Sequence, residues 1–255
     1  MPADVPSGFL SSARPRVFAH RGLALDAPEN TLLAFLKALS AGATHIETDV
    51  HASLDGVAVI SHDADLTRLV GRDVRLDQLT LAELKRINLG EGQSFSSLSE
   101  ALDAFPDARF NIDVKTEDAI EPTAHAILSA NATTRVLITS FSEDRRRRAV
   151  HLLPGVATSA SASVFLKVFL AGTLGLNGLA RRSLRGIAAV QLPERVGVMR
   201  VVTPRLIRAM HLIGVEVHVW TVNEPSVMKR LLDLGVDGIV TDRCDLAVAL
   251  IAERN

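Results

Sequence analysis

Short runs of β-branched and other apolar residues alternate along the chain with longer segments whose apolar residues recur at helical spacing. The short runs predict eight strands, at residues 16–20, 45–51, 110–115, 135–139, 156–160, 188–192, 216–220 and 238–241. The clearest helical segments are residues 31–41, 142–152, 203–213, 225–234 and 245–253. Eight strand–helix units within 255 residues indicate an α/β fold of the TIM (β/α)8 barrel type.

One segment interrupts this alternation. Residues 62–110 contain no obvious barrel strand, but they include two helix-like stretches at 80–87 and 97–105. We therefore expect a small insertion after the second strand, at about residues 64–109, on one face of the barrel. No linker rich in proline, glycine or serine divides the chain, which predicts a single domain over residues 1–255.

Composition excludes several classes of function. The chain has 28 basic and 29 acidic residues, so its net charge gives no general attraction to nucleic acid or to a membrane. Its single cysteine, Cys244, excludes a disulfide within the chain and a cysteine-based zinc site. A metal site would then use carboxylate or imidazole ligands, and carboxylates favour hard cations such as Mg²⁺ or Ca²⁺.

The N-terminal residues lack a basic segment followed by an apolar core, so we expect no secretory signal and a cytoplasmic protein. The most apolar stretch, residues 161–182, is interrupted by Lys167 and three glycines, and it falls short of a membrane-spanning helix. We favour a buried barrel helix and a loop for this stretch. The alternative is a flap that touches a membrane, flanked by Arg181, Arg182 and Arg185.

Ionisable residues occupy one face of the predicted second strand. His45, Glu47, Asp49 and His51 alternate there with apolar residues and threonine. Because the outer helices require the apolar face, we expect the ionisable side chains to point into the barrel. Adjacent buried carboxylates are costly without a cation, so Glu47 and Asp49 are candidates to share one divalent ion.

The third and seventh predicted strands repeat this pattern. Asp113 would add a third carboxylate, and Lys115 lies nearer the C-terminal end of the same strand, where it could meet a metal-bound anion. Glu216, His218 and Trp220 share one face of the seventh strand. Active sites of such barrels lie at the C-terminal ends of the strands, so we expect these polar groups to converge on a site there.

Two histidines lie at strand ends. His20 and Arg21 end the first strand, and His62 follows the short apolar run 57–60, which we expect to pair with the second strand. The guanidinium of Arg21 offers a fork suited to phosphate, and Asp63 is placed to orient His62. Two histidines beside a metal form an acid–base pair suited to phosphodiester cleavage.

Seven short motifs, in order along the chain, resemble those of the glycerophosphodiester phosphodiesterase family. They are HRG at residues 20–22, PENT at 28–31, ETDV at 47–50, HD at 62–63, NIDVK at 111–115, WTVN at 220–223 and GVDGIVTD at 235–242. Residues 130–202 carry no matching motif. The resemblance implies a TIM barrel with a small insertion, and hydrolysis of glycerophosphodiesters to sn-glycerol 3-phosphate and an alcohol.

By this resemblance, Glu47, Asp49 and Asp113 would hold one divalent cation, Mg²⁺ or Ca²⁺, with Mn²⁺ also compatible. Asp113 stands where the family more often has glutamate, so its reach is one methylene shorter. His20 and His62 would form the acid–base pair, with His20 as the base and His62 as the acid by analogy with related barrel phospholipases.

The resemblance also assigns the substrate-binding side chains. Arg21 and Lys115 would bind the phosphate, and Trp220 would pack on the glycerol moiety. Glu29 and Asn30 precede the first helix, and we interpret them as a helix cap and turn in preference to site residues.

Two other functions stay open. A lysophospholipase D-like activity on lysophospholipids needs the same chemistry and a mouth that accepts an acyl chain, which the apolar residues 164–176 would favour if they line it. A barrel that binds a phosphorylated ligand without turnover should lack a histidine or a carboxylate, and none is missing. We expect a small-molecule partner and no nucleic acid, do not favour membrane contact, and leave the oligomeric state open.

Overall fold

The structure of the protein is a computed structural model, and it describes residues 8–173 and 177–254. The strands are β1 (Arg16–His20), β2 (His45–Ala52), β3 (Ala58–Ile60), β4 (Phe110–Val114), β5 (Val136–Thr139), β6 (Ala157–Thr158), β7 (Ala189–Pro193), β8 (Arg195–Val196), β9 (Met199–Arg200), β10 (Glu216–Trp220) and β11 (Gly238–Thr241). The helices are α1 (Leu32–Ser40), α2 (Thr67–Val70), α3 (Leu81–Leu84), α4 (Leu98–Ala104), α5 (Ile120–Ser129), α6 (Glu143–Leu152), α7 (Ala162–Thr173), α8 (Asn177–Ser183), α9 (Pro204–His211), α10 (Pro225–Leu234) and α11 (Cys244–Ala252). Two 3₁₀ turns are η1 (Leu76–Gln78) and η2 (Thr133–Arg135).

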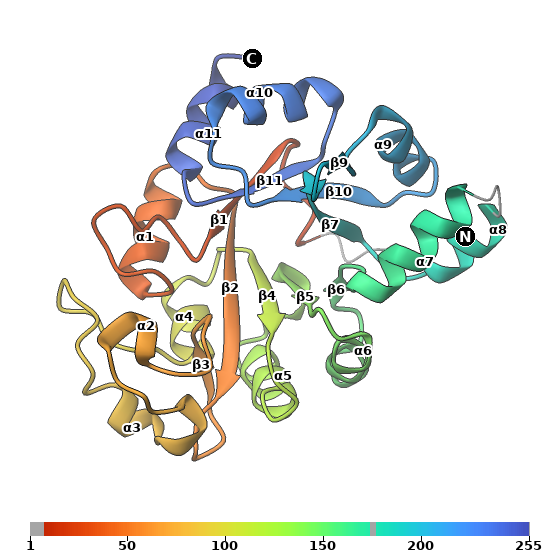
Figure 1. Ribbon diagram of the computed structural model, residues 1–255. Coiled ribbons are helices and arrows are strands. Elements are labelled where there is room, and N and C mark those ends of the chain that lie inside the picture. Colours follow the sequence, from red (N-terminus) through yellow and green to blue (C-terminus); the bar gives the residue numbers. More distant parts are fainter. Residues whose placement is uncertain (1–7, 174–176, 255) are drawn as a thin grey trace.

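Eight parallel strands form a nearly closed barrel in the order β6-β5-β4-β2-β1-β11-β10-β7. A parallel bridge between Ser159 and Ala189 joins the two end strands of this order. The helices lie between successive strands and cover the outside of the barrel (Figure 1). The predicted TIM-type barrel is confirmed, and all eight predicted strands overlap observed ones. The apolar run 57–60 pairs antiparallel with β2, as expected, with Val50 opposite Ile60.

The alternation of side chains divides the core into two parts. Residues such as Val17 and Ala19 of β1 face outward into the main cluster beneath the helices. Phe18 faces inward and joins a separate cluster inside the barrel with Phe9 from the N-terminal segment. Gly238 makes room for Phe18, because a Cβ at this position would lie 2.6 Å from Phe18 Cε2.

Local sequence signals start and end the helices. The side chain of Thr31 accepts a hydrogen bond from the Ala34 backbone N–H and so caps α1. Thr203 caps α9 in the same way, with Pro204 in the first turn. Helix α10 ends at Gly235, whose φ of 86° is the left-handed conformation typical of a helix C-terminus. These caps account for the close agreement between the predicted and observed helix bounds.

The segment between β3 and α4 contains α2, η1 and α3, and it has an apolar cluster of its own around Leu66 and Phe95. Helix α4, which lies within the expected insertion 64–109, supplies Leu98 and Leu102 to the main cluster and packs against α5. It therefore serves as an outer helix of the barrel. The apolar stretch 164–176 begins within α7, and its last three residues lie outside the described residues. Within the described residues, no helix has both the length and the apolar character needed to cross a membrane.

Candidate active site

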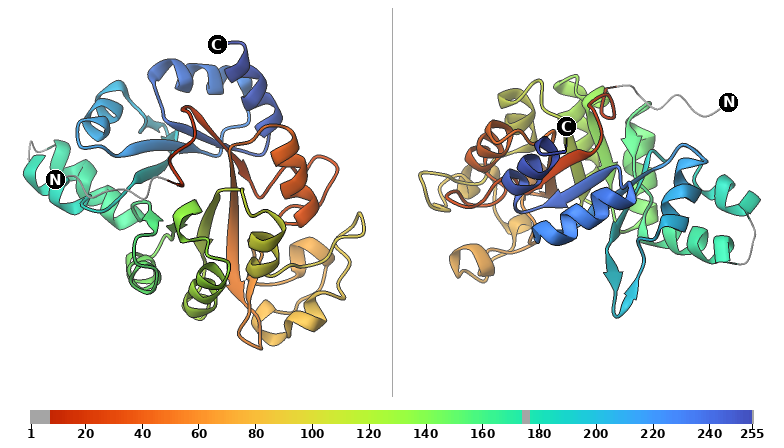
Figure 2. Two further views of the ribbon diagram at one scale, coloured as in Figure 1. Left: turned by 180° about the vertical axis from the view of Figure 1, so that it is seen from behind. Right: turned by 90° about the horizontal axis from the view of Figure 1, so that it is seen from above.

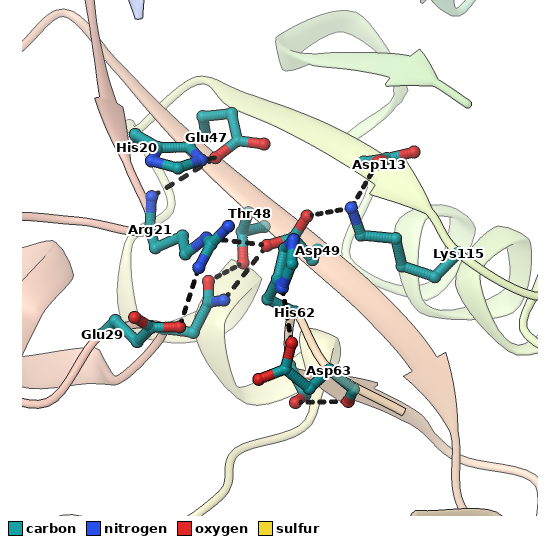
Figure 3. A network of polar contacts seen from close by, with 12 residues as sticks. His20, Arg21, Glu29, Glu47, Thr48, Asp49, His62, Asp63, Asp113 and Lys115 are labelled. Carbon is teal, nitrogen blue, oxygen red and sulfur yellow. Dashed lines mark hydrogen bonds and ion pairs between the residues drawn. The ribbon is translucent and has the colours of Figure 1, made fainter. Parts of the chain in front are cut away.

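A cavity of about 460 Å³ opens at the C-terminal ends of the barrel strands. It is lined by all eight side chains to which the sequence assigned a catalytic, metal-binding or substrate-binding role: His20, Arg21, Glu47, Asp49, His62, Asp113, Lys115 and Trp220. Strand geometry brings them together, since parallel strands point alternate side chains inward and all end at the same rim. Figure 3 shows the polar members of this group facing one another.

Three carboxylates lie side by side on β2 and β4. Asp49 is the strand-register partner of Asp113, and Glu47 precedes Asp49 on the same inward face. The Lys115 Nζ atom lies 2.7 Å from Asp49 Oδ1 and 2.6 Å from Asp113 Oδ2. The ammonium group of Lys115 thus bridges two of the three carboxylates.

The electrostatics of this cluster are unfavourable to its full ionisation. Burial, together with the charge of Asp49, raises the pKa of Glu47 to about 8. Burial also raises the pKa of Asp113 above its ordinary value, although Lys115 opposes the shift. Burial lowers the pKa of Lys115, but Asp49 and Asp113 outweigh this effect and raise it. The cluster therefore carries more carboxylate than Lys115 alone compensates.

The oxygen atoms of this cluster are of the type that a hard cation requires. Asp113 Oδ1 is buried, and none of the described residues gives it a hydrogen-bond partner. The described residues contain no ready-made group of three histidine, cysteine or acidic side chains arranged around a vacant ion position. The Lys115 ammonium lies between Asp49 and Asp113, where it would compete with a cation.

His20 is held by a carboxylate from the other end of the chain. Its Nδ1 lies 2.6 Å from Asp242 Oδ1, and its Nε2 lies 3.9 Å from Glu47 Oε2. Asn223 donates from Nδ2 to Asp242 Oδ2 at 2.6 Å and fixes that carboxylate. Burial lowers the pKa of His20, but the hydrogen bond to Asp242 and the charge of Glu47 together raise it above its ordinary value.

His62 has a carboxylate partner as well. Its Nδ1 lies 2.8 Å from Asp63 Oδ1, which agrees with the orienting role expected for Asp63. Asp63 also forms an ion pair with Arg68 of α2. Each histidine of the cavity is therefore hydrogen-bonded at Nδ1 to an aspartate, which orients the ring.

Arg21 lies at the rim with a left-handed backbone, φ 59°. Its Nη1 donates to Glu29 Oε1 at 3.0 Å, and its Nε lies 3.5 Å from Asp49 Oδ2. Asn30 donates from Nδ2 to the same Asp49 oxygen at 3.3 Å, while Thr31 is the residue that caps α1. Asn30 and Glu29 thus contact site residues directly, beyond the cap-and-turn role expected for them, and Figure 3 shows Glu29 beside Arg21.

The opposite wall of the cavity is apolar. It is lined by side chains at the end of β7 or in the segments after β5, β6 and β7, namely Phe141, Phe165, Leu192, Pro193, Val196 and Val201. The Trp220 ring packs edge-on to Phe141, with ring centroids 6.1 Å apart. The Nζ atom of Lys115 lies 6.0 Å from the centroid of Phe141, so the polar floor and the apolar wall meet at this ring.

The sequence prediction missed Asp242 as a site residue. Register explains its position: Ala19 of β1 pairs with Thr241 of β11, so the next residues, His20 and Asp242, lie side by side. Glu216 and His218, which were expected at the site, point into the barrel but do not line the cavity. Glu216 instead binds Arg16 at 2.8 Å and His218 at 3.0 Å.

Comparisons with known proteins agree with this geometry. The sequence model of the glycerophosphoryl diester phosphodiesterase family matches residues 20–246. The chain is 48% identical over 240 residues to the protein named "probable glycerophosphodiester phosphodiesterase 2" of Mycobacterium tuberculosis, covering 93% of this chain and 91% of that protein.

Solved structures show the same fold. A crystal structure from Silicibacter pomeroyi DSS-3 superposes with a TM-score of 0.81 at 22% identity, covering 95% of this chain and 94% of that one. A phosphodiesterase of Oleispira antarctica, solved in complex with its product sn-glycerol-3-phosphate, superposes with a TM-score of 0.76 at 24% identity, covering 94% and 97%. The extent of the family match and the near half identity to a relative over almost the whole length show that this chain belongs to the glycerophosphoryl diester phosphodiesterase family.

Proposed function

We propose that this protein hydrolyses glycerophosphodiesters to sn-glycerol 3-phosphate and an alcohol, with His20 and His62 as the acid–base pair. The observation that carries the proposal is one cavity in which two aspartate-backed histidines flank a cluster of three carboxylates, an arginine and a lysine. The names of the related proteins support the same substrate class.

Glu47, Asp49 and Asp113 are the residues that would hold a divalent cation, Mg²⁺ or Ca²⁺. The unpartnered Asp113 Oδ1 and the raised pKa of Glu47 support this fit, because a cation would neutralise the excess carboxylate. When bound, the ion would supply electrostatic stabilisation to a phosphoryl oxygen. The ammonium of Lys115, relieved of its carboxylate partners, would then be free to bind the phosphate together with Arg21.

The histidines move the protons. His20 Nε2 accepts the proton of the glycerol hydroxyl next to the phosphodiester, whose oxygen bonds to phosphorus and forms a cyclic phosphate, and Asp242 stabilises the resulting imidazolium through Nδ1. His62 donates a proton to the oxygen of the alcohol as its bond to phosphorus breaks, and Asp63 orients the ring. Water then opens the cyclic phosphate: His62 accepts a proton of the water, and the His20 imidazolium returns its proton to the glycerol oxygen, which leaves sn-glycerol 3-phosphate. Trp220, at the end of β10, would pack on the glycerol moiety.

A second substrate class is favoured by one observation, the apolar wall that includes Phe165, Val196 and Val201. An acyl chain of a lysophospholipid would find apolar contacts there, next to the same catalytic groups. We therefore treat lysophospholipase D-like hydrolysis as the alternative function.

The test is release of glycerol 3-phosphate from glycerophosphocholine and glycerophosphoethanolamine, with EDTA and with added Mg²⁺, Ca²⁺ or Mn²⁺. We expect cation-dependent release that falls by at least about 10² in His20→Ala, His62→Ala and Glu47→Ala. His125→Ala is the matched control, because His125 is exposed on α5, outside the cavity. Bound metal without release from either diester would reject the proposal, and choline release from lysophosphatidylcholine would then support the alternative.

A further inference from the structure

Positive charge is concentrated in one part of the chain. Residues 161–215 contain eight of the 28 basic residues but only one of the 29 acidic residues, Glu194. All eight basic side chains are exposed: Lys167, Arg181, Arg182, Arg185, Arg195, Arg200, Arg205 and Arg208. The remainder of the chain is correspondingly acidic, so the near-zero net charge conceals a strongly basic region.

The same region exposes large apolar side chains. Strands β8 and β9 form a two-stranded hairpin, and Val198 in its turn is 96% exposed. Val196 of β8 is 60% exposed, and Leu166 of α7 is 57% exposed. Arg195 and Arg200, which are register partners, flank the apolar turn of the hairpin.

These elements border the mouth of the active-site cavity. Phe165 of α7 and Val196 of β8 line the cavity, and the exposed Leu166 and Val198 follow them closely in the sequence, in α7 and in the hairpin turn. Figure 2 shows the β8–β9 hairpin projecting beyond the barrel, on the side where α7 and α8 lie. We call the exposed face of α7, α8 and this hairpin the basic–apolar rim.

We propose that the basic–apolar rim docks this protein on an anionic lipid surface, with the hairpin turn inserted among the headgroups and the cavity mouth facing the membrane. Exposed apolar side chains flanked by arginines are typical of surfaces that bind anionic membranes. The apolar side chains insert into the membrane interface, and the arginines pair with lipid phosphates. A second copy of the chain is a poor occupant, because a two-fold contact would place one basic surface against the other.

Glu194, the one acidic residue of this segment, does not neutralise its positive charge. Arg195, Arg200 and Arg230 all approach the same Glu194 oxygen, at 3.5, 3.9 and 2.5 Å. One carboxylate compensates one positive charge. Residues 161–215, which include Arg181 and Arg182 of α8, contain no second acidic residue. Residues 161–215 therefore keep an excess of seven positive charges with histidine neutral.

The experiment is co-sedimentation of the full chain with phosphatidylcholine vesicles, with and without phosphatidylglycerol, at low and high salt. We expect binding to the anionic vesicles only, weakened by salt. Val198→Asp and the double variant Arg181→Gln/Arg182→Gln should each lower the partition coefficient by at least about tenfold. Both should leave turnover of the water-soluble glycerophosphocholine unchanged, because these residues do not line the cavity.

Matched controls lie on the other outer helices. Leu128→Asp changes a leucine of α5 that is 51% exposed, and Arg147→Gln/Arg148→Gln changes a second adjacent pair of exposed arginines on α6. Absence of binding to anionic vesicles, or an equal loss in the controls, would overturn the proposal. A dimer in light scattering that Val198→Asp dissociates would also overturn it, in favour of a second copy. The readout does not depend on catalysis, so it stands apart from the test of the proposed function.

Discussion

Asp242 Oδ1 lies 2.6 Å from His20 Nδ1, across the line where the last strand of the barrel meets the first. The two residues are 222 positions apart in the chain. Asn223, which follows β10, holds Asp242 through its amide and also accepts the Asp242 backbone N–H at 2.9 Å. Three loops of the rim therefore fix the orientation of one imidazole ring, and this arrangement places Nε2 toward the carboxylate cluster.

We expect Asp242→Asn to lower kcat for glycerophosphodiester hydrolysis by at least about 10², because the amide no longer favours the required histidine tautomer or stabilises its protonated form. The pKa of His20 is raised partly by Asp242, so the acidic limb of the pH profile should move to lower pH in the variant. Steady-state rates measured across pH test both effects. Asp245→Asn, which removes an aspartate that pairs with Arg243 outside the cavity, should leave the profile unchanged. A purely structural role for Asp242 would lower the rate without moving that limb.

A divalent cation should change how stability depends on pH. Burial and Asp49 raise the pKa of Glu47 from its ordinary 4.5 to about 8. A carboxyl with a raised folded-state pKa favours the fold only while protonated, so the unfolding free energy of the cation-free protein should fall as pH rises from 4.5 through about 8. A bound cation stabilises the ionised cluster, and it should therefore reverse this fall.

Urea unfolding between about pH 5 and pH 8, with EDTA and with Mg²⁺, measures this effect. Glu47→Gln should flatten the pH dependence in EDTA and abolish the stabilisation by Mg²⁺, because it removes one ionisable ligand. An unchanged slope in Glu47→Gln would show that another group causes the pH dependence.

The apolar wall of the cavity should raise kcat/KM for substrates that carry an acyl chain and leave kcat/KM for substrates without one unchanged. Phe165→Asp is expected to lower the ratio of kcat/KM for lysophosphatidylcholine to that for glycerophosphocholine by about tenfold, because a buried phenyl contact with the acyl chain is lost. The measurement compares choline release from the two substrates under identical conditions. Leu36→Asp alters an exposed leucine of α1 away from the cavity and should keep the ratio constant. An equal loss on both substrates would mean that Phe165 supports the shared catalytic groups.

Position 22 requires glycine because its backbone lies against the backbone of α1 at Ala34. Its φ is +86°, and a Cβ there would lie 2.7 Å from the Ala34 carbonyl carbon at the start of α1. Gly22→Ala should therefore cost about 3 kcal/mol or more in urea unfolding, combining the left-handed backbone with a backbone clash. Gly56→Ala, also at positive φ but with open space around it, should cost only about 1 kcal/mol. Equal losses would contradict the role assigned to the contact with α1.

The sequence determined which side chains enter the barrel. The alternation in β2 predicted that His45, Glu47, Asp49 and His51 face inward; Glu47 and Asp49 line the cavity, while Ile46 and Val50 join the outer apolar cluster. Its physical basis is local, because a strand turns successive side chains to opposite faces whatever its neighbours are. Motifs at strand ends likewise marked His20 and His62, and helix caps such as Thr31 set helix bounds through contacts within a few residues.

Only the tertiary structure decided how far along the barrel each inward side chain lies. Phe18 is the register partner of His45, and His45 binds the Phe9 carbonyl at 2.9 Å inside the packed interior, away from the cavity. Glu216 likewise binds Arg16, although its position on β10 has the same parity as Trp220. The face to which a strand residue points repeats every two residues and can be read from the sequence. The position of that residue along the barrel axis depends on the stagger between neighbouring strands, which only the assembled barrel sets. The pairing of His20 with Asp242 is also tertiary, because β1 and β11, the first and last strands of the chain, become neighbours only when the sheet is assembled.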